Sequence, residues 1–242
     1  MKQRKPLNWV LPHEIEARLG EGTVGRQRVI AEADHLLIIL HNPPLPDRME
    51  RVPILFLRKP NGILLANGQD QGELKLRKLL ADYRQSWEEC DKAYDTAETA
   101  EQILRLLELL APLNRSSTNL ARTLQAARDA AKNDKFLIGM RDESEEISRA
   151  FELLTSDAKL KLDYRIASNS EAQAEQARVM NSAQHRLNVL AAITLPIMAL
   201  STILGMNLHN GLEEHPPLVF FLVLTLGIVI GFFVKLWVSR RH

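Results

Sequence analysis

The sequence has a single cysteine, few aromatic residues and almost no net charge. It contains one cysteine, Cys90, among 242 residues, which excludes an intramolecular disulfide framework and a thiolate metal cluster. Aromatic residues make up 5% and the formal net charge is +1, so the composition indicates no surface for nucleic acid. No glycine-rich phosphate loop ending in Gly-Lys-Ser or Gly-Lys-Thr occurs. We therefore expect no enzyme, no cofactor and no nucleic-acid partner.

The histidines show no paired spacing that suits a metal. They stand at His13, His35, His41, His185, His209, His215 and His242. A dedicated zinc site is not indicated. The serine, aspartate and histidine residues likewise match no nucleophile motif, so we predict no catalytic residue.

Long apolar runs are missing from the first 186 residues and then occur twice. Neither Leu187 to Leu208 nor Leu218 to Val234 contains a charged residue. Since about 20 apolar residues cross a membrane as a helix, we predict spans at 187–208 and 218–238, with Lys235 reaching back to the interface. The alternative is a pair of buried core helices in a soluble protein.

The positive charges next to the spans predict their orientation. They stand at Arg178, Arg186, Lys235, Arg240 and Arg241, whereas residues 208–217 have neither lysine nor arginine. By the positive-inside rule both termini are cytoplasmic, and we expect a multi-pass protein of the inner or plasma membrane. The basic start, residues 1–6, leads into no apolar stretch, so we expect no cleaved signal peptide.

The N-terminal part, residues 1–70, has the pattern of a small cytoplasmic α/β segment. Residues 28–41 and 53–66 are strand-like, and Asn61-Gly62 favours a hairpin turn in the second. Prolines 43, 44 and 46 indicate the loop between these regions.

Residues 71–186 have a helical pattern, with apolar residues three or four apart. We predict breaks near Asp91 to Thr96, at Pro112 and at Asn133-Asp134, and hence two or three antiparallel helices before a last long one. That stalk helix begins at about Asp142 and continues into the first span. Before Asn169 a monomeric bundle helix explains the pattern equally well. The predicted fold class is an α+β membrane protein, mostly α.

The two spans differ in polarity. The first carries Asn188 and Thr202 near one face, which suits a water-filled path, whereas the second offers only Thr225 and should face lipid. Two helices cannot enclose such a path, so ion transport requires several copies of the chain. The Gly227 and Gly231 pair predicts a groove for contact with the first span.

The end of the first span reads Gly205-Met206-Asn207. This tripeptide, before a short external loop (209–217), a second span and a cytoplasmic tail (239–242), resembles the signature of the CorA family of magnesium and cobalt transporters, of which this chain looks like a short member. The resemblance implies a homopentamer with a cytoplasmic funnel and a stalk helix that lines the pore. It also implies a selectivity filter at Gly205, Met206 and Asn207.

Matching backwards from the signature assigns further positions. The pore-lining positions are Asn181, Leu195, Met198 and Thr202, and Pro196 matches a family proline. The family often has threonine where Met198 falls and glycine where Thr202 falls. Amide oxygens of an Asn207 ring would hold the water shell of Mg²⁺, which dehydrates reluctantly. Glu213 and Glu214 in the loop would attract cations, unless they are ordinary solvated glutamates.

In the family, cytoplasmic Mg²⁺ between subunits closes the pore. The candidate regulatory carboxylates here are Asp142, Glu143 and Glu146, with Glu145, Asp157 and Asp163 nearby. Ordinary solvated helix faces are the alternative explanation for each. Because residues 1–70 are short for the family, we expect weakened sensing.

Together with these patterns, the resemblance implies a passive channel for Mg²⁺, driven by the membrane potential, with Co²⁺ or Ni²⁺ as poorer substrates. Its partners are copies of itself and the lipid bilayer. One alternative is a transporter of zinc or another divalent cation, although Met206 favours magnesium. The other is a membrane-anchored scaffold that does not conduct.

Overall fold

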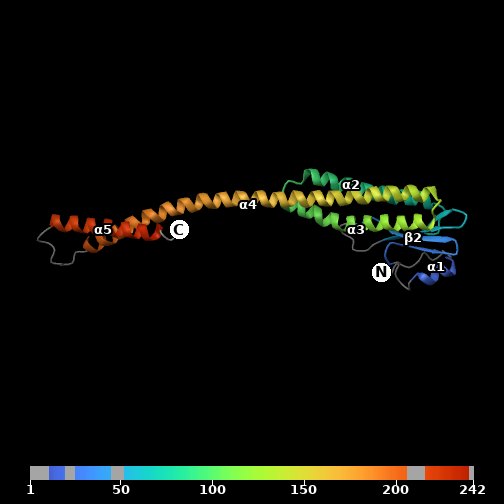
Figure 1. Cartoon of the computed structure of the whole chain (residues 1–242), viewed down its shortest axis with the longest axis horizontal. Coiled ribbons are helices and arrows are strands. Elements are labelled where there is room, and N and C mark those ends of the chain that lie inside the picture. Colours follow the sequence, from blue (N-terminus) through green and yellow to red (C-terminus); the bar gives the residue numbers. More distant parts are fainter. Residues whose placement is uncertain (1–10, 20–24, 45–51, 206–215, 240–242) are drawn as a thin grey trace. The chain divides into compact units, whose positions relative to one another are not determined.

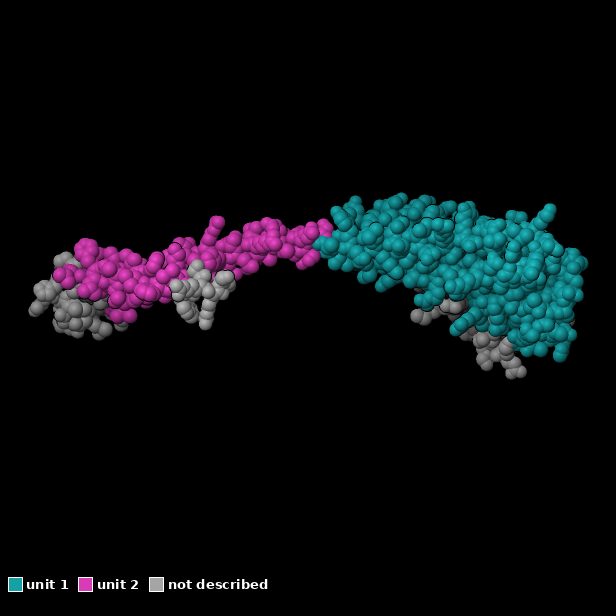
Figure 2. Space-filling model, in the orientation of Figure 1, with its two compact units in different colours: residues 1–167 teal, residues 168–242 magenta. Residues whose placement is uncertain are grey.

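A computed structural model describes residues 11–19, 25–44, 52–205 and 216–239 (Figure 1). These residues belong to two compact units, residues 1–167 and residues 168–242, which Figure 2 colours separately. The described parts are mostly helical, with one small sheet near the N-terminus, in agreement with the predicted mostly α class.

The sheet of the first unit is an antiparallel meander of four strands in the order β1-β2-β3-β4. The strands are β1 (Arg28–Glu32), β2 (His35–His41), β3 (Pro53–Arg58) and β4 (Leu64–Ala66). Each strand-like region of the sequence is therefore a hairpin. In the second, the predicted turn at Asn61-Gly62 is confirmed, since Gly62 has a φ of +86° and its N–H donates to the Lys59 carbonyl.

The first hairpin has a turn that the sequence pattern does not indicate. Residues 28–41 read as one uninterrupted strand-like region, yet the chain reverses at Ala33 and Asp34. Both residues have positive φ, 49° and 58°, a conformation that alanine adopts rarely. The pairing of β1 with β2 imposes this turn against the local preference.

Strand β2 is buried on both faces. One face packs on the helices through Leu36, Ile38 and Leu40. On the other face, Leu37 and Ile39 belong to the core cluster that includes Ile15 of helix α1 (His13–Arg18). This double burial explains the continuous apolar run in its sequence.

Three helices follow the sheet. They are α2 (Gly72–Thr96), α3 (Ala100–Ala130) and α4 (Lys135–Gly205). The predicted break near Asp91 to Thr96 is confirmed, because α2 ends at Thr96 and Thr99 caps α3 in a capping box with Gln102. The predicted break at Pro112 is wrong, since α3 continues through it. Packing of its apolar stripe on both sides of Pro112 outweighs the lost hydrogen bond.

Helix α4 begins earlier than the pattern predicts, at Lys135 rather than at about Asp142. Asp134 accounts for this start, because its Oδ1 accepts hydrogen bonds from the Phe136 and Leu137 backbone N–H groups at 3.0 and 3.2 Å. Its Oδ2 also pairs with the Arg58 Nε of β3, 2.6 Å away. The predicted break at Asn133-Asp134 is therefore confirmed and is tied to the sheet.

In the first unit, α4 buries one apolar stripe against its neighbours. Ile147, Phe151, Leu154 and Ala158 are buried, whereas Ile166, in the same stripe, is 55% exposed. A buried polar cluster supports the same core: the Tyr83 hydroxyl lies 2.6 Å from Ser116 Oγ and donates to the His41 carbonyl at 3.1 Å.

The second unit holds the rest of α4 and helix α5 (Pro216–Ser239). Among the described residues, α4 is the one helix that is long and apolar enough to cross a membrane, judged by length and composition. The described apolar part of α5, Phe220–Leu236, is shorter than that criterion requires. The second span therefore stays a prediction.

Candidate functional site

The pore-lining positions assigned from sequence all lie on α4 within the second unit. Asn181, Leu195, Met198 and Thr202 have exposed side chains, with Leu195 at 61% and Met198 at 62%. Gly205 is the last residue of α4. The other predicted site residues, Met206, Asn207, Glu213 and Glu214, lie outside the described residues.

These four positions share one face of the helix. Asn181 and Asn188 are seven residues apart, and Leu195 and Thr202 continue the same heptad spacing, which keeps all of them on one side. Met198 lies one turn before Thr202, and its carbonyl oxygen accepts a hydrogen bond from the Thr202 hydroxyl at 2.7 Å. The face thus offers an amide at one end and a hydroxyl oxygen near the other.

Helix α5 packs on a different face of α4. A Cβ added at Gly227 would lie 3.2 Å from Ile197 Cγ1, and one at Gly231 would lie 3.3 Å from the Ile193 Cα and carbonyl oxygen. The predicted contact of this glycine pair with the first apolar helix is confirmed. At 100° per residue, Ile193 and Ile197 lie roughly opposite Leu195 and Thr202.

The face of α4 that carries Leu195, Met198 and Thr202 is therefore left uncovered by α5. Ile193, Ile197 and Leu200 are only partly exposed, because α5 covers them, while Leu195 and Met198 remain open. Within one chain, α5 packs on the opposite side of α4 and leaves the predicted pore-lining face exposed.

The candidate regulatory carboxylates lie in the first unit and are balanced by arginines. Arg84 of α2 lies 3.4 Å from Glu143 and 3.7 Å from Glu146, measured between Nη2 and the carboxylate oxygens. Asp142 pairs in the same way with Arg141 at 3.1 Å. Sequence reasoning missed Arg84, because its distance from these acids along the chain carries no local signal.

These acids do not form a metal site within one copy. Among the residues that the structure describes, no three or more histidine, cysteine, aspartate or glutamate side chains are grouped so as to hold a metal ion. The carboxylates at Glu143 and Glu146 already face a guanidinium, which repels Mg²⁺. The resemblance implies a site between subunits, so the regulatory role of Asp142, Glu143 and Glu146 stays a prediction.

The lone thiol has no sign of reactivity. Cys90 is buried in the helical core, and that burial raises the pKa of its thiol, with the Glu89 charge acting in the same direction. Because the thiolate is the reactive form, Cys90 is a packing residue.

Comparison with known proteins identifies a family for this chain. The family model described as CorA-like Mg²⁺ transporter protein matches residues 70–241. One similar solved structure, of the full-length CmaX protein, is 15% identical, with 97% of this chain and 82% of that chain covered and a TM-score of 0.48. Another, the complete CorA magnesium transporter from Methanocaldococcus jannaschii, is 18% identical, with 89% and 79% covered and a TM-score of 0.37. Comparison with curated proteins gave no match.

Proposed function

The chain belongs to the family of CorA-like Mg²⁺ transporter proteins, a family of membrane transporters of divalent cations, and from that premise we propose that it is one subunit of a passive Mg²⁺ channel. Several copies, five by the family's example, surround a path lined by α4. Co²⁺ and Ni²⁺ are expected as poorer substrates.

One observation carries the proposal. Helix α5 packs through Gly227 and Gly231 on the side of α4 that carries Ile193 and Ile197, which leaves the Leu195 and Met198 side open. A single chain with an apolar α4 and one covered side cannot enclose water, so the open sides must meet around a shared axis if an ion is to cross. In this proposal α5 is the second span and lies outside the path, toward lipid.

The chemistry at the outer end follows from Asn207. Five amide oxygens can accept hydrogen bonds from the water shell of Mg²⁺ without stripping it, which suits an ion that dehydrates reluctantly. Helix C-termini that converge near Gly205 add partial negative charge and favour cations over anions. Glu213 and Glu214 would raise the cation concentration at this entrance.

The driving force needs no nucleotide. A potential of about 100 mV, negative inside, contributes about 2.3 kcal/mol per charge and about twice that for a divalent ion. With both termini cytoplasmic and the 209–217 loop outside, this potential drives Mg²⁺ inward through an inner or plasma membrane. Closure by cytoplasmic Mg²⁺ is weak in this proposal, since Arg84 occupies the place of a cation beside Glu143 and Glu146.

The test is Mg²⁺ entry into proteoliposomes that contain the purified full chain, measured with an internal magnesium dye. Uptake should depend on an imposed inside-negative potential and should fall strongly in Asn207→Ala. Asn210→Ala, the same change three residues further on, is the matched control and should conduct like the wild type.

Three results would contradict the proposal. Uptake of Zn²⁺ but not Mg²⁺ would assign another divalent substrate. Equal uptake by the Asn207→Ala and Asn210→Ala variants would remove the filter from Asn207. A folded oligomer without any flux would favour the membrane-anchored scaffold.

A further inference from the structure

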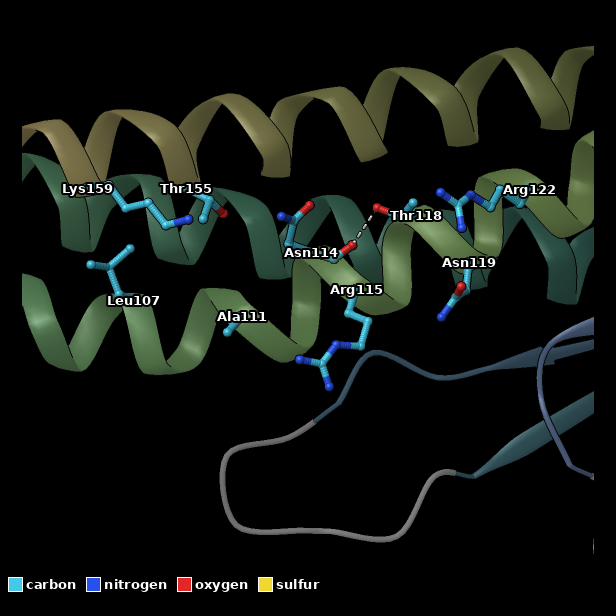
Figure 3. Close-up of a pocket in the computed structure, with 9 residues that line it drawn as sticks. All are labelled: Leu107, Ala111, Asn114, Arg115, Thr118, Asn119, Arg122, Thr155 and Lys159. Carbon is cyan, nitrogen blue, oxygen red and sulfur yellow. Dashed lines mark hydrogen bonds between the residues drawn. The ribbon is translucent and has the colours of Figure 1, made fainter.

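The first unit has a groove between α3 and α4 whose charged lining is entirely basic. Its volume is about 430 Å³, and Arg115 and Arg122 of α3 line it together with Lys159 of α4 (Figure 3). The remaining lining residues are uncharged, and Asn114 Oδ1 is buried there without a hydrogen-bond partner. Within the described ranges, no carboxylate forms an ion pair with any of the three basic side chains, so an acidic partner is missing.

The basic side chains follow the groove instead of converging on one point. Arg115 and Arg122 are seven residues apart, which is about 10 Å along the helix axis. In Figure 3, Lys159 lies along the groove, whereas Arg115 points away from α4. A small anion could not contact all three, so an extended acidic surface fits better.

Helix α2, which is drawn behind the groove in Figure 3, carries such a surface. Glu88, Asp91 and Asp95 are three and four residues apart and therefore share one face. Glu88 and Asp95 are exposed, and in the described part of the chain none of the three has an ion-pair partner. From Glu88 to Asp95 the stripe covers a seven-residue interval, about 10 Å along the helix axis.

The two surfaces also match in height along the helices. The Lys161 ammonium of α4 donates to the Tyr94 carbonyl of α2 at 2.7 Å, so the two residues lie within the reach of one lysine side chain. Asp95 directly follows Tyr94, and Lys159 comes two residues before Lys161. The acid and the base are therefore within about two helical turns of the same height.

The second pair behaves in the same way. The Ser148 hydroxyl of α4 donates to the Thr118 hydroxyl of α3 at 3.4 Å. Because α3 runs opposite to α4, Arg115, three residues before Thr118, lies near the turn that follows Ser148. The Arg84 side chain of α2 reaches Glu143, and Glu88 lies one turn further along α2, in the direction in which α4 runs. Glu88 and Arg115 therefore lie about one turn apart in height.

We propose that the α3–α4 groove of one copy receives the α2 stripe of the next copy, so that Arg115 faces Glu88 and Lys159 faces Asp95 between subunits. The proposal rests on the proposed function, which requires several copies around an axis. A ring whose axis runs along these helices keeps every residue at its own height, and two different complementary faces are what a closed head-to-tail ring needs. Opposite charges at matched heights set the register between neighbours.

Cysteine cross-linking of the full chain in detergent, in a Cys90→Ala background, tests the pairs directly. The pair Arg115→Cys with Glu88→Cys should form disulfides between copies and give a ladder of multimers, and Lys159→Cys with Asp95→Cys should do the same. The control combines Arg115→Cys with Glu89→Cys. Glu89 is also acidic and exposed, but it points about 100° away around α2, so it should cross-link little.

A charge exchange supplies a second readout. Arg115→Glu places a second carboxylate opposite Glu88 at every proposed interface and should weaken association at least about tenfold. Oligomer mass, measured as a function of protein concentration, gives this change. Glu88→Arg added to it should restore the wild-type mass. Failure of restoration, or cross-linking as strong with Glu89→Cys as with Glu88→Cys, would overturn the proposal.

Mg²⁺ flux in the same preparations separates this inference from the proposed function. A conducting oligomer without the predicted cross-links refutes the interface and leaves the channel intact. Predicted cross-links in a protein that does not conduct support the interface and refute the channel. Saturable binding of inorganic phosphate to the wild-type groove, abolished by Arg122→Ala, would assign the groove to an anion and overturn the subunit contact.

Discussion

Gly231 of α5 lies directly against the backbone of Ile193 in α4, so close that a Cβ at position 231 would be 3.3 Å from both the Ile193 Cα and its carbonyl oxygen. Contact with backbone cannot be relieved by a side-chain rotation. This pair therefore determines which side of α4 is covered by α5, and with it which side stays exposed.

Gly231→Ala should separate the two helices and destabilise the second unit by about 1–3 kcal/mol, the usual cost of overpacking. Thermal unfolding of the full chain in detergent measures this. Gly139→Ala is the matched control, because nothing lies within 4 Å of a Cβ there and α4 is helical at that point. It should leave stability unchanged or raise it by about 1 kcal/mol. Equal behaviour of the two variants would contradict the close contact.

The open face of α4 should be accessible to water in the assembled protein. In a Cys90→Ala background, a charged, water-soluble thiol reagent should block Mg²⁺ flux through Met198→Cys. The same reagent should have little effect on Leu200→Cys, because Leu200 packs beside Gly227 of α5. Block of both variants, or of Leu200→Cys alone, would reverse the assignment of the two faces.

Asp134 joins the start of α4 to the sheet. Asp134→Ala removes the acceptor for the Phe136 and Leu137 N–H groups and leaves Arg58, 23% exposed at its side chain, without its partner. We expect a loss of about 2 kcal/mol or more in the free energy of unfolding, measured by denaturant titration. Asp134→Asn keeps a capping oxygen and should lose less. An alanine variant as stable as the wild type would show that neither contact matters.

Arg84 should suppress Mg²⁺ binding at Glu143 and Glu146. Wild-type protein should gain little protease protection from added Mg²⁺, whereas Arg84→Ala should gain more, because two carboxylates lose their counter-charge. Arg105→Ala, which removes an exposed arginine paired with Glu101, is the control and should behave like the wild type. Strong protection of the wild type would mean that Mg²⁺ displaces Arg84.

The amino-acid sequence by itself determined the features that depend on short stretches of chain. Composition predicts a long apolar helix from the charge-free run, and the spacing of Gly227 and Gly231 predicts a close helix contact. Local backbone preference predicts the turn at Asn61-Gly62 and the break at Asn133-Asp134. The family match over residues 70–241 agrees with the resemblance that rests on Gly205-Met206-Asn207.

Only the tertiary structure decided the features that depend on how distant segments align. Packing carries α3 through Pro112, strand pairing forces the turn at Ala33-Asp34, and the register of α2 against α4 brings Arg84 to Glu143. The side of α4 that α5 covers belongs to the same class. Each results from contacts between residues far apart in the chain, whose energies outweigh local preferences that would predict otherwise.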